Sequence, residues 1–213
     1  MKNQAESLKK YFGKKLILNE NLSKYSWFNL GGPAEVFFRP DSVEELIKFL
    51  KASVNSFTNI NIIGAGSNTL IRDGGIKGLT IKLSSKFSYL KKLDDNTIEA
   101  GASTLDKKLS NFAADNSISG FEFLSCIPGS VGGAIIMNCG CFNYEISNIL
   151  ISLNAIDYTG KVIEIKKKDI NFYYRGSNLS KDLIITSAKF KGLKSSMELI
   201  KAKQDYLINK KDK

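Results

Sequence analysis

The first third of the chain combines one helical hydrophobic pattern with two short apolar runs. Residues 40–53, PDSVEELIKFLKAS, carry apolar residues three and four positions apart, which predicts a helix, and Ser42 and Glu45 predict a capping box at its start. The runs at 60–64 and 78–83 predict short buried strands. Strands that alternate with a helix in this way indicate a small α/β unit.

After residue 84 the pattern predicts strands that pair with their neighbours in the sequence. Residues 87–102 contain two strands around an Asp-Asp-Asn turn, 149–165 an antiparallel hairpin around a Thr-Gly turn, and 182–192 one more strand. A second capped amphipathic helix is predicted at 103–117. The apolar residues expected on its buried face are Leu105, Leu109 and Phe112.

These patterns together predict an α+β fold with two lobes, a small α/β lobe and a largely antiparallel α+β lobe. The predicted segments are a lysine-rich lead-in of helix and loop at 1–24, a first lobe at 25–83, a second lobe at 84–192, and a connection to a further domain at 193–213. The last segment begins like a helix. Without a partner face, its apolar surface around Ile200 and Leu207 is expected to be exposed and to favour association.

The composition limits the class of partner. With 43% hydrophobic and 24% charged residues, the 213-residue chain is typical of globular proteins, and it shows no signal-peptide or membrane-spanning pattern, so we expect a cytoplasmic protein with no membrane partner. Lys and Arg outnumber Asp and Glu by 31 to 21, but the arginines are only Arg39, Arg72 and Arg175, and the lysines are scattered. We therefore expect no nucleic-acid partner and a surface that suits anionic ligands. The sequence leaves the oligomeric state unknown.

Few side chains are available for nucleophilic or metal chemistry. The chain has no histidine, which excludes Ser–His and Cys–His mechanisms, histidine acid–base catalysis and a flavin linked through histidine. The three cysteines, Cys126, Cys139 and Cys141, are an odd number, and the last two are too close in sequence for a paired zinc site. We expect reduced, partly buried thiols and no metal.

The loop at 64–69, Gly-Ala-Gly-Ser-Asn-Thr, follows an apolar run as a dinucleotide-binding loop would. A Rossmann loop requires Gly or Ala at position 69, then a helix, then an acidic residue near position 85. The chain instead has Thr69, a break at 73–75 and Ser85, so the Rossmann interpretation fails. Small residues still allow backbone N–H groups to converge on an anion, which predicts a phosphate site, with a plain tight turn as the alternative.

A second stretch rich in small residues, SCIPGSVGGAIIMNCG, spans 125–140. Ser130 is predicted to cap a helix whose unpaired N–H groups face a phosphate or a ring. Two such loops from two lobes could clamp one extended, diphosphate-containing cofactor. The alternative is that these glycines only allow close packing of helices.

Four motifs, in this order, resemble the UDP-N-acetylenolpyruvoylglucosamine reductase family: YSWFNLGGPAEVFFRP, IIGAGSNTLIRDGGIKGLTIKL, IPGSVGGAIIMNCGC and FYYRGS. The resemblance extends from about Tyr25 to the end of the sequence. It implies an FAD-binding domain of the p-cresol methylhydroxylase and vanillyl-alcohol oxidase type. It also implies an NADPH-dependent flavin oxidoreductase, a UDP-N-acetylmuramate dehydrogenase, which reduces an enolpyruvyl UDP-sugar to UDP-N-acetylmuramate for peptidoglycan in the cytoplasm.

The resemblance also implies site residues. The loop that would wrap the pyrophosphate of a non-covalently bound FAD consists of Gly64, Ala65, Gly66, Ser67, Asn68 and Thr69. The segment that would contact the cofactor nearer the flavin comprises Pro128, Gly129, Ser130, Gly132, Gly133 and Ala134, with Asn138 and Gly140 close by. The Tyr-Arg dipeptide would supply catalytic Arg175 beside the flavin and the substrate carboxylate, and Tyr174 in the substrate site.

Arginine suits the chemistry that the resemblance implies at position 175. Hydride addition to the β-carbon of an enol ether leaves negative charge at the α-carbon, which delocalises into the neighbouring carboxylate. A planar, permanently charged guanidinium binds that carboxylate with two hydrogen bonds and stabilises it further as its charge grows. A surface salt bridge at a strand edge is the alternative role for Arg175.

The sequence also departs from the family. Family members continue into a third, substrate-binding domain with a serine proton donor and a glutamate, and this sequence ends where that domain should begin, so we expect FAD binding with little or no turnover. Cys141, Phe142 and Asn143 stand where relatives often have Ala, Tyr and Gly, and a thiol near a flavin could alter its redox behaviour. Two alternatives remain: another flavin oxidoreductase of this type that acts on an alcohol or sugar, and a non-catalytic remnant or basic binding module.

Overall fold

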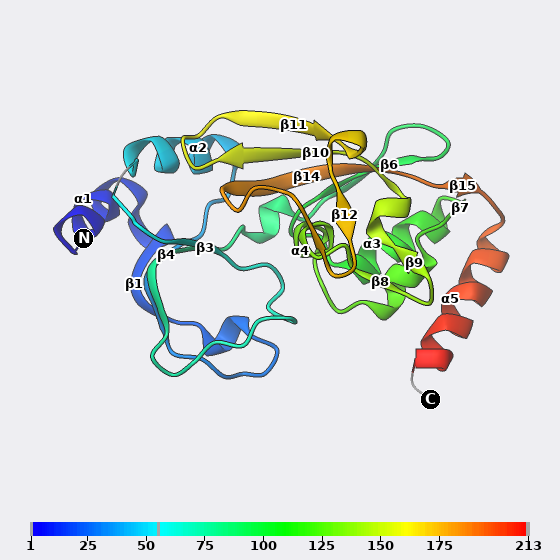
Figure 1. Cartoon of the computed structure of the whole chain (residues 1–213), viewed down its shortest axis with the longest axis horizontal. Helices are drawn as coiled ribbons and strands as arrows, with labels where there is room; N and C mark the ends of the chain where they lie inside the picture. Colours follow the sequence, from blue (N-terminus) through cyan, green and yellow to red (C-terminus); the bar gives the residue numbers. More distant parts are fainter. Residues whose placement is uncertain (1, 55, 212–213) are drawn as a thin grey trace.

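The computed structural model describes residues 2–54 and 56–211, and two sheets form its frame (Figure 1). The first sheet has the order β1-β2-β4-β3. Its strands are β1 (Leu16–Asn21), β2 (Pro33–Phe38), β4 (Ile76–Ile81) and β3 (Ile60–Ile62). β1 pairs antiparallel with β2, whereas β2, β4 and β3 run parallel. The short strand β3 is therefore the edge of a mixed sheet.

Helices α1 (Lys2–Phe12) and α2 (Val43–Ala52) complete the first lobe. The rings of Phe38 from β2 and Phe49 from α2 stack with centroids 3.8 Å apart, and Phe12 packs edge-on against both. Ser42 caps α2 as predicted, because its hydroxyl accepts the Glu45 N–H. The second half of the predicted capping box is wrong: the Glu45 carboxylate accepts from the Asp41 N–H and from Lys15 instead.

The second sheet is antiparallel throughout and has the order β11-β10-β14-β6-β5. Its strands are β11 (Val162–Lys166), β10 (Leu150–Asp157), β14 (Leu183–Lys191), β6 (Thr97–Gly101) and β5 (Leu90–Lys92). The hairpin predicted at 149–165 is confirmed as β10 and β11, and the two strands predicted at 87–102 are β5 and β6. Gly160, in the turn of the first hairpin, lies against α2, so the two lobes touch there.

Helices α3 (Asp106–Asp115), α4 (Val131–Ile136) and α5 (Met197–Lys211) lie on one side of the second sheet (Figure 1). Three two-stranded sheets lie among these elements. One pairs the remote strands β7 (Ile118–Ser119) and β15 (Leu193–Lys194), and two are hairpins: β8 (Gly140–Cys141) with β9 (Tyr144–Glu145), and β12 (Phe172–Tyr173) with β13 (Gly176–Ser177). Short 3₁₀ helices lie at Gly13–Lys15, Ser23–Tyr25, Ser85–Phe87, Glu122–Cys126, Ile146–Asn148 and Lys167–Asp169. Most buried apolar side chains of both lobes form one continuous core.

Three sequence predictions about elements are wrong. The segment 1–24 contains strand β1 in addition to a helix, because Leu16 is fully buried beside β2. The run at 60–64 forms an edge strand whose side chains stay partly accessible. The helix predicted from 103 starts at Asp106 without a side-chain cap, and Leu105 is 43% exposed, because residues 102–106 pair through their backbone with residues 129–132.

The expectation of an exposed apolar face at the end of the chain is also wrong. Ile200 and Leu207 are 2% and 4% exposed, because α5 packs its inner side against α3 and the 3₁₀ helix 122–126. Gln204, on the same side, donates a hydrogen bond to the Ser110 hydroxyl at 2.7 Å. The apolar side of α5 is thus covered by elements of the second lobe itself. Residues 212 and 213 of the predicted connection lie outside the described residues.

Candidate functional site

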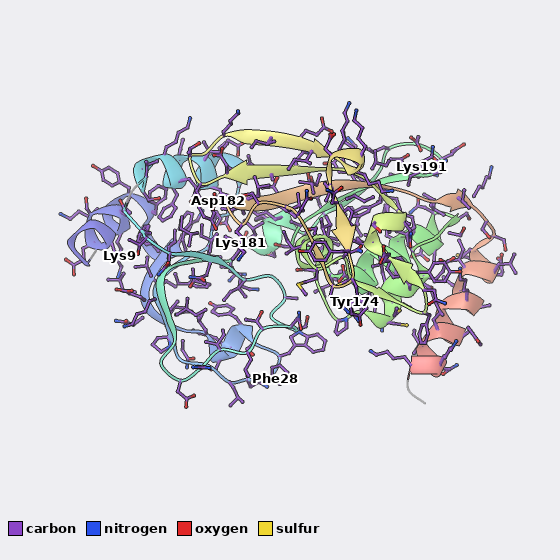
Figure 2. All side chains as sticks on the ribbon, in the orientation of Figure 1. Lys9, Phe28, Tyr174, Lys181, Asp182 and Lys191 are labelled. Atoms are coloured by element: carbon purple, nitrogen blue, oxygen red, sulfur yellow. The ribbon has the colours of Figure 1, made fainter. Side chains whose placement is uncertain are left out.

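A cavity of about 820 Å³ lies where the two lobes meet. One wall is formed by β3 and the loop at 64–69, and the other by the segment 127–134 together with β14. Lys181, which precedes β14, lies on the side of the second sheet that faces β3 (Figure 2). The two stretches rich in small residues that the sequence singled out therefore meet at one cavity.

The loop at 64–69 follows β3, and backbone N–H groups of this loop are unpaired within the described part of the chain. Gly66 has a φ of +76°, and a Cβ there would lie 1.9 Å from the Tyr25 carbonyl oxygen, so the loop follows its path only with glycine at this position. The Gly66 carbonyl accepts the Trp27 N–H at 3.2 Å. The N–H groups of residues 64–67 donate to no other atom of the described residues. All six residues of the loop line the cavity, which suits an anion that needs donors.

The segment at 128–134 forms the opposite wall. Ser130 stands at the N-cap of α4 with extended backbone, but its hydroxyl makes no capping hydrogen bond. The prediction that the first N–H groups of this helix are unpaired is wrong for two of them, because Val131 and Gly132 donate to the carbonyls of Thr104 and Ala102, both at 2.9 Å. The segment is thus clamped to the 102–106 turn. Its predicted cofactor residues all line the cavity: Pro128, Gly129, Ser130, Gly132, Gly133 and Ala134.

The two walls approach each other closely at Gly64 and Ser130. A Cβ built on Gly64 would lie 2.8 Å from the Ser130 hydroxyl oxygen. A Cβ on Gly133 would meet nothing nearer than the same oxygen, at 3.8 Å, so that position opens onto the cavity. Glycine therefore keeps space between the lobes at positions 64 and 133.

Arg175 enters the cavity from the turn between β12 and β13. Its φ is +60°, a left-handed conformation that an L-residue other than Asn or Asp seldom adopts. Tyr174, the other residue of the turn, is 86% exposed at the tip of the hairpin and does not line the cavity (Figure 2). The Arg175 guanidinium lies 5.5 Å from the centroid of the Tyr174 ring. Of the predicted Tyr-Arg pair, the structure brings only Arg175 to the cavity.

Asn138 and Gly140, the two remaining predicted site residues, lie behind the cavity wall. Asn138 is 3% exposed, and its amide donates to the Tyr173 carbonyl at 3.3 Å and accepts the Ser147 N–H at 3.2 Å. It therefore anchors the hairpin that carries Arg175. A Cβ on Gly140 would lie 2.3 Å from the Tyr144 carbonyl oxygen, so this glycine permits the β8–β9 hairpin.

The charged residues that line the cavity are all basic. Arg175 and Lys181 contribute to the wall, whereas no Asp or Glu of the described residues does. The lining also has many apolar side chains, with Ile60, Leu183 and Tyr158 among them. The Tyr158 hydroxyl donates to the Lys181 carbonyl at 2.9 Å and lies 3.3 Å from the Ile60 carbonyl, so it joins the lobes. An anionic molecule with apolar parts fits this lining.

The sequence reasoning missed two titratable side chains directly behind the cavity. Lys82 donates a hydrogen bond to the Gly64 carbonyl, and burial, followed by the nearby charge of Arg39, lowers its pKa to about 8. Asp106 is fully buried, neither of its carboxylate oxygens has a partner among the described residues, and burial raises its pKa to about 8. Both follow ordinary strand or helix patterns, so only their tertiary surroundings distinguish them.

The three cysteines are free thiols, and one of them reaches the cavity. Cys139 lines the wall, and burial, then the charge of Asp106, raises its pKa. Cys141, which the sequence suggested as a thiol near a flavin, does not line the cavity, and its thiol donates to the Phe123 carbonyl. Within residues 2–54 and 56–211, no group of three His, Cys, Asp or Glu residues is arranged to hold a metal ion. None of the helices described combines the length and the apolar character needed to cross a membrane.

Comparison with known proteins gives matches over most of the chain. A family model described as an FAD binding domain matches residues 34–166. The UDP-N-acetylenolpyruvoylglucosamine reductases of Pelagibacter ubique and Rickettsia canadensis are 48% and 44% identical over 93% and 84% of this chain. The chain spans 66% and 60% of the length of these two relatives.

Two solved structures resemble the whole arrangement. The UDP-N-acetylenolpyruvylglucosamine reductase from Thermus caldophilus has a TM-score of 0.78 and 27% identity, and the match covers 92% of this chain and 68% of that chain. An alkyldihydroxyacetonephosphate synthase has a TM-score of 0.63 at 16% identity, over 91% of this chain and 40% of that chain. The second likeness concerns the fold alone.

Proposed function

The chain belongs to the FAD-binding domain family, and from this we propose that it binds FAD non-covalently in the cavity between its lobes. We further propose that the bound cofactor serves the reduction of UDP-N-acetylenolpyruvoylglucosamine to UDP-N-acetylmuramate with NADPH, a cytoplasmic step of peptidoglycan precursor synthesis. The observation that carries the proposal is the convergence of the 64–69 loop, the 128–134 segment and Arg175 on one cavity.

The residues present fit the proposed cofactor. The N–H groups of residues 64–67 have no partner among the described residues and match the oxygens of a pyrophosphate. The wall holds Arg175 and Lys181 but no described carboxylate, which suits a ligand with negative charges. A volume of about 820 Å³ is within the usual range for cofactor pockets. The 64–69 loop would hold the pyrophosphate, and the 128–134 segment would contact the cofactor nearer the flavin.

In this proposal the protein contributes binding, orientation and electrostatics. When bound, FAD supplies the hydride transfer that no side chain of this chain can perform. Arg175 binds the enolpyruvyl carboxylate of the UDP-sugar and holds its β-carbon toward the cavity. As negative charge develops in the carboxylate, the permanently charged guanidinium stabilises it. Asn138 keeps the β12–β13 hairpin, and with it Arg175, in place. Tyr174 is proposed to contact the substrate at the tip of the same hairpin.

The first test compares hydride donors and carboxylate recognition in the FAD-loaded chain. We expect NADPH to bleach the flavin absorbance under anaerobic conditions, and sugars or alcohols to leave it unchanged. Addition of UDP-N-acetylenolpyruvoylglucosamine should perturb the oxidised flavin spectrum, with affinity about tenfold or more lower in Arg175→Met and intermediate in Arg175→Lys.

The opposite pattern identifies the alternative function. Reduction by an alcohol or sugar with release of peroxide, together with no response to NADPH, would assign the chain to another flavin oxidoreductase of this fold. An unchanged substrate affinity in Arg175→Met would remove Arg175 from the proposed site.

A further inference from the structure

Lys82 contacts the 64–69 loop from outside the cavity. It follows β4, and its ammonium donates a hydrogen bond to the Gly64 carbonyl. Lys82 does not line the cavity, although Gly64 does, so the two lie on successive layers of the wall. The Lys82 Nζ also lies 5.8 Å from the centroid of the Tyr25 ring, and the Tyr25 carbonyl is the atom that a Cβ on Gly66 would strike. Lys82 and Tyr25 together therefore support the underside of the loop.

The positive charge of Lys82 has no counter-charge among the described residues. Lys15 in the same lobe pairs with Asp41 and Glu45 at 3.1 and 2.8 Å. Lys24 pairs with Glu20 at 2.9 Å. Lys82 is partly buried but forms no ion pair with a described carboxylate, and its one oxygen partner is a neutral carbonyl. Holding an unpaired ammonium under a loop of unpaired N–H groups is costly unless an anion occupies the loop.

We propose that Lys82 is a positioning residue and counter-charge for a diphosphate bound on the 64–69 loop. This inference rests on the proposed function, because the diphosphate is that of FAD. The hydrogen bond to the Gly64 carbonyl fixes the peptide orientation at the start of the loop and leaves the N–H groups of residues 64–67 for the ligand. The ammonium acts on the diphosphate through the thin layer of loop backbone, where little water lies between the two charges to screen them.

Binding of a diphosphate should raise the pKa of Lys82 from its low value near 8. Above pH 8 the chain must then take up a proton when the ligand binds, so the affinity falls as the pH rises. Tyr25, which faces Lys82, stays neutral in this range, because burial, then the hydrogen bond to Glu20, raises its pKa to about 12. Asp106, in the other lobe, also has a pKa of about 8, so every protein that is compared must retain Asp106.

The test compares Lys82→Met and Lys82→Arg with the wild-type chain. Lys82→Met keeps the length of the side chain and removes the charge, and we expect its Kd for FAD and for ADP to rise about tenfold at pH 7. Lys82→Arg should retain most of the affinity. Riboflavin, which has no phosphate, should bind all three proteins equally. Lys77→Met is the matched control, because Lys77 lies exposed on β4, the strand that Lys82 follows.

The pH profile provides a second readout. The ratio of the Kd values of Lys82→Met and wild type should shrink between pH 7 and 9.5, because only the wild type loses a charge at position 82, and both proteins keep Asp106. Far-UV circular dichroism and thermal melting establish that each variant is folded. A misfolded Lys82→Met leaves Lys82→Arg to decide: its Kd ratio to wild type must then fall as the pH rises.

The outcomes separate the two levels of the proposal. A wild-type chain that binds FAD, combined with a folded Lys82→Met of unchanged FAD affinity or a ratio that does not vary with pH, contradicts the role of Lys82 alone. Equal losses of riboflavin and FAD affinity in Lys82→Met would also contradict it, since a general defect of the site explains them. A wild-type chain that binds neither FAD nor ADP contradicts both the proposed function and this inference.

Discussion

Asp106 begins a helix and also lies directly beneath a segment that lines the cavity. It opens α3 inside the protein, where its N–H donates to the Gly129 carbonyl at 3.1 Å. A Cβ on Gly129 would lie 2.4 Å from the Asp106 carboxylate, so glycine at 129 is what allows the carboxyl group to fit beneath the 128–134 segment. A carboxyl group buried without a partner keeps its proton at pH values well above the ordinary pKa of Asp.

The stability of the chain should depend on pH through Asp106. Its pKa rises from 3.8 to about 8 on folding because of burial. Between these values the native chain holds a proton that the unfolded chain releases, so the stabilisation present at low pH is lost as the pH rises. Asp106→Asn should therefore gain stability relative to the wild type by roughly 1.4 kcal/mol per pH unit between pH 5 and 7.

Urea unfolding at pH 5, 6 and 7 measures this difference. Asp95→Asn, in the exposed turn between β5 and β6, is the matched control and should show no trend. A constant difference between wild type and Asp106→Asn across the three pH values would show that Asp106 is ionised in the folded chain.

Residues of the site differ in how far the sequence could predict them. The glycines of the 64–69 loop and Arg175 stand in sequence motifs that predict anion binding, and the structure brings them to one cavity. Lys82 gives no such signal, since one lysine among many is distinguished only by contacts with Gly64 and Tyr25, which are distant in sequence. The left-handed φ of Arg175 is likewise a property of the folded hairpin.

At the scale of elements, two backbone segments define the site. The 64–69 loop belongs to the first lobe and the 128–134 segment to the second, and Gly64 and Ser130 face each other across the gap between them. The second segment is held by three backbone hydrogen bonds to the 102–106 turn. The distance between the segments is therefore set by tertiary packing of the lobes. A small increase in side-chain volume at Gly64 should displace one of the segments and change the shape of the cavity.

Gly64→Ala should weaken FAD binding. Its Cβ would overlap the Ser130 hydroxyl at 2.8 Å, so one of the two segments must move. We expect the Kd for FAD to rise about tenfold or more, with partial recovery in the double variant Gly64→Ala/Ser130→Ala, which removes the opposing oxygen. Fluorescence titration with FAD measures the effect.

Gly74→Ala provides the comparison, because a Cβ at Gly74 meets no atom within 4 Å. It should bind FAD like the wild type. Equal losses in Gly64→Ala and Gly74→Ala, or no recovery in the double variant, would refute the idea that these two segments form opposite walls of one cofactor site.

The elements that hydrophobic periodicity predicted well are those whose pattern and packing agree. Helix α2 and the β10–β11 hairpin have local signals, a serine cap and a Thr-Gly turn, that tertiary contacts reinforce. Strand β1 and the late start of α3 were missed because their backbone partners are remote: β1 pairs with β2, and the turn before α3 pairs with residues 129–132. Sequence patterns do not report such partners.

At the scale of the whole molecule, the α+β fold of two lobes is confirmed, and it is the FAD-binding type predicted from the four motifs. The first lobe presents a mixed sheet whose edge strand β3 faces the cavity, and the second presents an antiparallel sheet with its helices on one side (Figure 1). The boundary at 83 and 84 stays a prediction. The continuous core across both lobes explains how two segments distant in sequence can line one cavity.

The central claim is that this chain binds FAD in the cavity between its lobes, and a loading experiment tests it most directly. The purified chain is incubated with excess FAD, passed through a gel-filtration column and measured for flavin absorbance and for flavin released by denaturation. We predict that about one FAD per chain elutes with the protein and is released on unfolding, as expected of a non-covalent complex. A folded chain that elutes without flavin, while the free FAD elutes separately, would contradict the account.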